Sequence, residues 1–188
     1  MGGLNKREHL IETGQNQILT HGYDLSSIKN ITAAAGLPKG SFYHYFESKE
    51  KFALEAMDQF VNAFEEQLPD KQDNLLTISK LIDARINAIV KINYARECYM
   101  SIMSHASTNE DEGFRHSVVN ALERSTRTIN SLLAKLMKKG LISSDYDLKE
   151  LQEFVDFSWR GARLKAKLLK SEQPLVIFKK YLMEYILK

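Results

Sequence analysis

The chain has 188 residues, of which 44% are hydrophobic and 27% charged, and its formal net charge is +2 at pH 7. No apolar run reaches the roughly 18 residues that a membrane span needs, so the composition predicts a soluble globular protein. The single cysteine, Cys98, excludes an intramolecular disulfide and fits a reducing cytoplasm. Three prolines and nine glycines are too few for the turns of an all-β fold, which favours an all-α fold.

Three short helices are predicted at the N-terminus. The first carries apolar residues at helical spacing and ends at Gly22. The second begins at Ser26 or Ser27, either of which can cap it, and ends at Gly36. The third is very short and covers residues 39–46.

A fourth helix, over residues 48–68, connects these to a larger set of helices, and residues 69–74 read as a linker. Beyond the linker, helical periodicity with sparse breakers predicts five more helices. They cover residues 75–92, 97–105, 113–139, 147–169 and 173–187. The sequence thus predicts about nine helices and no strand.

The second and third helices have the features of a helix-turn-helix. Such a unit joins two short helices by a tight turn that often contains glycine, and its second helix enters the DNA major groove. Gly36 suits the turn, and Phe42 and Phe46 share one face of the third helix, which buries them. The open faces then carry polar or stacking side chains, namely Lys39, Ser41, Tyr43, His44 and Tyr45. This pattern favours a DNA-reading role over packing alone.

The charge of this region is nearly balanced. Residues 1–51 carry six Lys or Arg against five Asp or Glu. This balance neither requires nor excludes a nucleic-acid partner, because binding depends on where the basic groups lie. Non-specific attraction to DNA should be weak for one subunit, so useful affinity should need a dimer.

Residues 35–50, AGLPKGSFYHYFESKE, resemble the signature of the tetracycline-repressor (TetR/AcrR) family. The likeness is close over the first ~60 residues and extends beyond them only in the number and length of the helices. It implies a three-helix DNA-binding domain over residues 1–51, followed by a helical ligand-binding and dimerisation bundle over residues 52–188. The implied function is that of a dimeric repressor, released from a palindromic operator by a small-molecule inducer.

The resemblance also implies which residues contact DNA. Lys39 and Gly40 match residues that meet phosphate or a base edge, and lysine can reach guanine O6 and N7. The groove-facing positions match Ser41, Tyr43 and His44, and the phosphate-contacting positions match Ser27, Tyr45 and Lys49. The alternative for His44 is a solvated surface residue.

A narrower resemblance concerns Cys98. Residues 96–100 and 159–167 resemble the electrophile-responsive, N-ethylmaleimide-type repressors of the family, which sense reactive carbonyls or hypochlorous acid. A cysteine at the position of Cys98 and a lysine matching Lys167 carry that response. A helix N-terminus and a neighbouring arginine would lower the thiol pKa, whereas the adjacent glutamate opposes this. The alternative is that Cys98 is a small core residue.

A ligand pocket is expected among the helices of the second domain. The sensor candidates are Cys98, Tyr99, Met103, Trp159 and Lys167, and further aromatic and methionine side chains that could line the pocket are Tyr94, Met100, Phe114 and Phe157. Aromatic and methionine residues at helical spacing also suit an ordinary core, and both interpretations stay open. Nothing in these residues identifies the ligand.

The helix over residues 147–169 has two apolar stripes, so one can face its own core and the other a partner. The resemblance implies that this helix and the last one form the dimer interface. A dimer would place two recognition helices about 34 Å apart, on the two half-sites of a palindrome.

Enzymatic activity is not expected. Cys98 and His105 would lie ~10 Å apart on one helix, too far for a nucleophile and its base. No glycine-rich phosphate loop or metal-ligand spacing of the five histidines occurs, so no catalytic residue, cofactor or metal is predicted. Three rivals remain open: an activator, a regulator that responds to a protein partner, and a helical interaction module with no DNA role.

Overall fold

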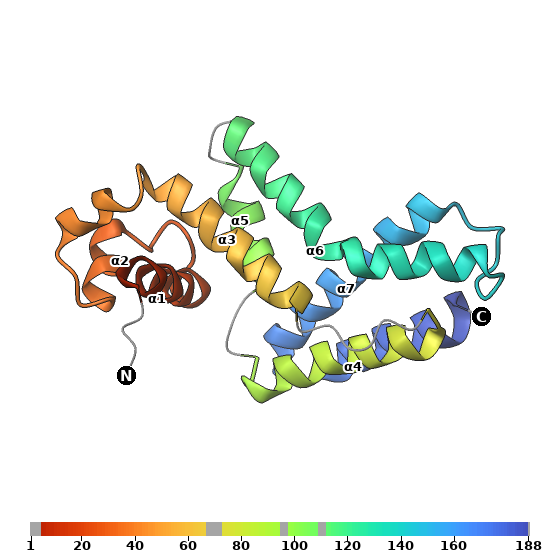
Figure 1. Ribbon diagram of the computed structural model, residues 1–188. Coiled ribbons are helices and arrows are strands. Elements are labelled where there is room, and N and C mark those ends of the chain that lie inside the picture. The colour runs from red at the N-terminus through yellow and green to blue at the C-terminus, as the bar shows by residue number, and fades with distance from the viewer. Residues whose placement is uncertain (1–4, 67–72, 95–97, 109–111, 188) are drawn as a thin grey trace. The chain divides into compact units, whose positions relative to one another are not determined.

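The computed structural model describes residues 5–66, 73–94, 98–108 and 112–187. Within these ranges every regular element is a helix and no strand is formed, so the predicted all-α fold is confirmed (Figure 1). The described residues hold nine helices when the π turn at the C-terminus is counted with the helix before it. None of these helices combines the length and apolarity needed to cross a membrane.

The chain divides by packing into two compact units that interleave along the sequence. The first unit comprises Met1–Glu66 and Arg96–Ser125, and the second comprises Gln67–Ala95 and Thr126–Lys188. Packing and function need not share a boundary, so the functional division after residue 51 stays a prediction.

Five complete helices and the beginning of a sixth form the first unit. They are α1 (Lys6–His21), α2 (Ile28–Ala34), the 3-10 helix η1 (Lys39–His44), α3 (Lys49–Glu66), α5 (Tyr99–Ala106) and the first part of α6 (Glu112–Lys138). Side chains cap three of them. Asn5 accepts the Arg7 N–H at 3.1 Å, Ser27 accepts the Asn30 N–H at 3.2 Å, and the Ser48 hydroxyl accepts the Lys51 N–H at 3.2 Å, as is common at helix starts.

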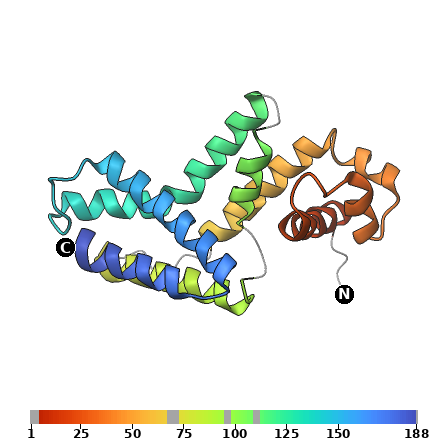
Figure 2. The same ribbon diagram turned by 180° about the vertical axis from the view of Figure 1, so that it is seen from behind.

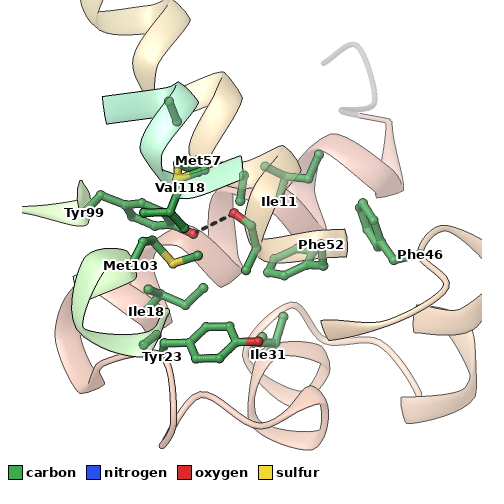
Figure 3. Packing of buried hydrophobic residues seen from close by; sticks show 14 of the residues in the cluster. Ile11, Ile18, Tyr23, Ile31, Phe46, Phe52, Met57, Tyr99, Met103 and Val118 are labelled. Atoms are coloured by element: carbon green, nitrogen blue, oxygen red, sulfur yellow. Dashed lines mark hydrogen bonds between the residues drawn. The ribbon is translucent and has the colours of Figure 1, made fainter. Parts of the chain in front are cut away.

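The core of the first unit joins α1, α2 and the segment around η1 to α5 and α6. Ile18, Ile31 and Phe52 are fully buried in the same cluster as Met103 and Val118 (Figure 3). The α5 helix packs against α1 and α3 (Figures 1 and 2). The N-terminal helices therefore do not pack by themselves, because α5 and α6, further along the chain, complete their core.

The third helix differs from the expected one. Residues 39–46 were predicted to be helical, whereas the structure has a 3-10 helix over Lys39–His44. The tighter winding ends with the Tyr45 N–H donating to the Phe42 carbonyl at 3.0 Å. A short segment that follows proline and contains Gly40 gains little from α-helical propagation, and 3-10 turns are used for such short pieces.

The second unit contains α4 (Leu75–Lys91), the rest of α6, α7 (Leu148–Leu169), α8 (Gln173–Tyr181) and the π turn η2 (Leu182–Ile186). The α8 helix packs against α7 and lies along α4 (Figures 1 and 2). Lys179 of α8 binds Asp83 of α4 at 2.6 Å. The predicted linker over residues 69–74 lies mostly outside the described residues.

Candidate nucleic-acid interface

The turn between α2 and η1 is built as the sequence predicts. Gly36 has φ +68°, a left-handed conformation that favours glycine. The Leu37 N–H donates to the Thr32 carbonyl at 2.9 Å, and the buried Thr32 hydroxyl donates to the Ile28 carbonyl at 2.8 Å. The Leu37 bond satisfies one of the last carbonyl groups of α2 and helps to fix the direction in which the chain leaves this helix.

Three phenylalanine rings pack together on the buried side of η1. Phe42 and Phe46 are buried, as predicted, with ring centroids 5.4 Å apart. The ring of Phe52 in α3 lies 5.5 Å from Phe42 and 5.0 Å from Phe46. This cluster holds η1 against α3, so the outer face of η1 is presented on a rigid base.

The outer face of η1 exposes most of the predicted DNA-reading residues. Lys39, Gly40, Tyr43 and His44 are exposed, and Tyr43 keeps 57% of its surface accessible. Ser41 and Tyr45 are half-buried, and Tyr45 packs on the edge of the core. Nothing lies within 4 Å of where a Cβ of Gly40 would be. The chain's own packing therefore gives no reason for glycine at that position.

The start of α3 provides the second part of this surface. The Lys49 ammonium lies 3.9 Å from the ring centroid of Tyr23, over its face. Hydrogen bonding from Ser48 and from the backbone lowers the pKa of Glu50, and Lys49 and the Tyr23 hydroxyl add to this. Sequence reasoning missed Tyr23, because this turn residue belongs to no helical stripe and its contacts are distant in sequence.

Arg7 connects α1 to α3 and to Phe46, which follows η1. Its guanidinium lies 5.0 Å from the centroid of Phe46 and bonds to Glu55 of α3 at 2.6 Å. Both side chains of this pair are about one-third exposed, so the pair contributes little to stability. Its structural effect is to orient α1 against the base of η1.

Three of the sensor candidates lie together in the first unit. Cys98 is half-buried at the N-terminal cap position of α5, and Tyr99 and Met103 are fully buried. The Tyr99 hydroxyl lies 3.5 Å from the Ala53 carbonyl oxygen, its ring stacks on Phe60, and burial raises its pKa far above the usual value (Figure 3). Tyr99 and Met103 thus have the environment of core residues.

The other two sensor candidates lie in the second unit. Trp159 is half-buried, with its ring 5.5 Å from Phe178, and Lys167 is half-buried on α7. The remaining lining candidates are similarly divided between the two units. Met100 and Phe114 are buried in the first unit, whereas Tyr94 packs on the core of the second and Phe157 is exposed.

The two predicted stripes of α7 are found. Leu151, Val155 and Ala166 are buried in the second core. The opposite stripe is exposed and continues onto α8 and η2, with Phe154, Phe157, Leu164, Leu168, Val176, Ile177, Tyr181 and Tyr185. Nothing lies within 4 Å of a Cβ on Gly161 in this stripe. An exposed apolar surface of this extent is typical of a surface that another protein covers.

Comparison with known proteins agrees with these features. Residues 10–56 match the family model of bacterial regulatory proteins, tetR family, and residues 75–182 match the tetracyclin repressor-like C-terminal domain. The transcriptional repressor DhaR of Mycobacterium sp. (strain GP1) is 28% identical over 96% of this chain and 92% of its own. The repressor NemR of Escherichia coli is 26% identical over 90% of this chain and 87% of its own.

Solved structures of similar fold are also transcriptional regulators. The crystal structure of the regulatory protein TetR from Rhodobacter sphaeroides is 26% identical, with a TM-score of 0.84 over 95% of this chain and 97% of its own. These relatives are transcriptional regulators and not enzymes. The two family matches cover the DNA-reading helices and most of the chain that follows, and the chain therefore belongs to the TetR family of bacterial regulatory proteins.

Proposed function

We propose that this chain is a dimeric repressor that binds a palindromic DNA operator and releases it in response to a small-molecule or electrophile inducer. The observation that carries the proposal is η1, a short helix with Lys39, Tyr43 and His44 exposed above the buried Phe42. A helix in this position can enter the major groove without unfolding anything beneath it. Because its target is DNA, we place the protein in the bacterial cytoplasm.

Two sets of residues would share the contacts with DNA. Base edges would be read by Lys39, Ser41, Tyr43 and His44, and phosphates would be bound by Ser27, Gly40, Tyr45 and Lys49. Glycine at position 40 supports this division, since no neighbour in the chain excludes a side chain there. A bare backbone instead allows a phosphate to approach closely.

The exposed stripe of α7 and α8 would be the dimer interface. Its aromatic and aliphatic residues have the composition of an interface core, and Gly161 leaves room for a partner helix. The near-balanced charge of the reading region makes a dimer necessary for useful affinity. Two copies would then bind the two halves of a palindrome.

The inducer could act through Cys98. The likeness to NemR and the partly exposed position of Cys98 at the start of α5 support a thiol sensor of the N-ethylmaleimide type. A conventional small-molecule ligand is the alternative, and Trp159 and Lys167 would then be its first candidate contacts. In either case the inducer must favour the DNA-free state by a few kcal/mol to release the operator.

Selection of bound genomic fragments tests the DNA-binding proposal and gives the operator. We expect an enriched palindrome, and Lys39→Ala and Tyr43→Ala should each weaken its binding at least tenfold. Lys80→Ala, which removes an exposed lysine of α4, is the matched control and should bind normally. Unchanged binding by both η1 variants would instead favour a helical module with no DNA role.

A reporter under the selected operator distinguishes repression from activation. Expression should fall when the protein is supplied and recover when an inducer is added. Treatment of the protein–operator complex with methylglyoxal or hypochlorous acid should release DNA from the native protein and not from Cys98→Ser. Release from Cys98→Ser at the same dose would end the thiol-sensor proposal and leave the repressor proposal intact.

A further inference from the structure

Tyr23 lies where three helices of the first unit meet. It is in the turn between α1 and α2, and only 3% of its surface is exposed. One face of its ring lies under the Lys49 ammonium at the start of α3. The ring also contacts Phe114 in the first turn of α6, with centroids 5.7 Å apart and planes at 41°. Figure 3 shows Tyr23 at the edge of the core, beside Ile18 and Ile31.

The contact with Lys49 has the geometry of a cation–π interaction. A distance of 3.9 Å from the ammonium to the ring centroid is well inside the roughly 6 Å limit of such contacts. The Tyr23 hydroxyl and Lys49 both contribute to lowering the pKa of the Glu50 carboxyl. Burial of the Tyr23 side chain, which is 3% exposed, restricts the movement of the ring beneath the ammonium.

We propose that Tyr23 is a positioning residue for DNA binding, which holds the Lys49 ammonium at the DNA-facing start of α3, ready to meet a backbone phosphate. The proposal rests on the proposed function of Lys49 as a phosphate contact. The new element is Tyr23, which would hold Lys49 in the position from which it contacts phosphate. Tyr23 itself is buried and does not touch DNA.

A lysine side chain that is ordered before DNA binds should increase the affinity for DNA. A lysine side chain loses rotamer entropy when it is fixed on a phosphate, and this loss weakens binding. A ring under the ammonium removes part of that freedom in advance. An ammonium has three N–H donors, so contact with a ring face does not prevent it from donating to a phosphate oxygen.

Phe114 of α6 packs against the Tyr23 ring that lies under the Lys49 ammonium. The same helix begins in the first unit and continues into the second beyond Ser125. The Tyr23 ring is thus supported from below by a helix that both units share. Phe114 is 4% exposed, so its ring has little freedom to leave Tyr23.

A series of fluorinated rings tests the proposal. Phenylalanine, 4-fluoro-, 3,5-difluoro- and 3,4,5-trifluorophenylalanine are placed at position 23, because fluorine weakens the negative ring face with little change in ring size. Affinity for the selected operator is measured in the native background and with Lys49→Met. Lys51→Met is the matched control, since Lys51 is an exposed lysine two residues further along.

In the native and Lys51→Met backgrounds, affinity should fall along the series, by about two- to fivefold per subunit from phenylalanine to the trifluorinated ring. In the Lys49→Met background it should stay flat. A flat series with Lys49 present, an equal fall in both backgrounds, or a rise with fluorination overturns the role of Tyr23. The proposed DNA-binding function is tested separately by Lys39→Ala. Loss of operator binding in that variant does not depend on the ring at position 23.

Discussion

The ring of Phe52 in α3 lies directly against the backbone of Gly14 in α1, so closely that a Cβ on Gly14 would collide with it. Phe52 is fully buried, and Phe42 and Phe46 pack against its ring. The ring therefore cannot move aside. The missing side chain at position 14 sets the distance between α1 and α3, the helices that support the DNA-reading end of the chain.

Gly14→Ala should destabilise the protein although alanine is the better helix former. The gain in helix propensity is at most about 1 kcal/mol, whereas overpacking a rigid core costs about 1–3 kcal/mol. Because the ring cannot move aside, the cost should lie at the upper end of this range, and we expect a net loss of about 2 kcal/mol in the free energy of unfolding, measured by urea denaturation. Gly40→Ala is the control and should leave the midpoint nearly unchanged, because nothing surrounds that position. Equal midpoints for the two variants would contradict the steric explanation.

Local sequence patterns predicted the parts of the fold that depend on neighbours along one helix. The burial of Phe42 and Phe46 follows from their spacing, and the stripe of α7 containing Leu151 and Val155 is buried as expected. The glycine turn at position 36 also follows from local chemistry, since only a residue tolerant of positive φ suits it.

Contacts between distant segments could not be predicted in the same way. Tyr99 has the periodicity of either a core or a pocket residue, and only the approach of α3, which brings the Ala53 carbonyl to its hydroxyl, decides its environment. Likewise, no pattern in the sequence places Tyr23 under Lys49. The 3-10 form of η1 was also missed, because the energies of α and 3-10 turns differ little in so short a segment.

Gly40→Ala, neutral for stability, should weaken operator binding. A methyl group at this exposed position would separate the backbone from a phosphate oxygen by more than hydrogen-bond distance. We expect about a tenfold loss of affinity with little change in its salt dependence, since no charge is removed. Lys80→Ala, an exposed substitution on α4 outside both the reading helix and the proposed dimer interface, serves as the control. Normal operator binding by Gly40→Ala would exclude a close backbone contact at this residue.

Lys170→Gly should stabilise the protein. Lys170 ends α7 in a left-handed conformation, φ 48° and ψ 44°, and the Ser171 N–H donates to the Ala166 carbonyl at 3.1 Å. Glycine adopts this conformation without the strain of a Cβ and is the usual residue there. We expect the free energy of unfolding, measured by urea denaturation, to rise by about 0.5–1 kcal/mol. Lys165→Gly, inside the same helix, should instead lower the free energy of unfolding by about 1 kcal/mol. If both variants stabilise or both destabilise the protein, the explanation is wrong.

Leu168→Glu should separate the dimer and thereby abolish operator binding. Leu168 is 74% exposed on the apolar stripe of α7, so the substitution does not disturb the core of one subunit. In a dimer, however, it would bury a carboxylate in each subunit without a partner, at a cost of several kcal/mol. Light scattering should give the mass of a monomer, with an unchanged helical circular dichroism spectrum. Leu76→Glu, which charges a similarly exposed leucine of α4, should remain dimeric and bind DNA. If Leu168→Glu is also dimeric, the interface lies elsewhere, and the exposed stripe of α7 and α8 must have another partner.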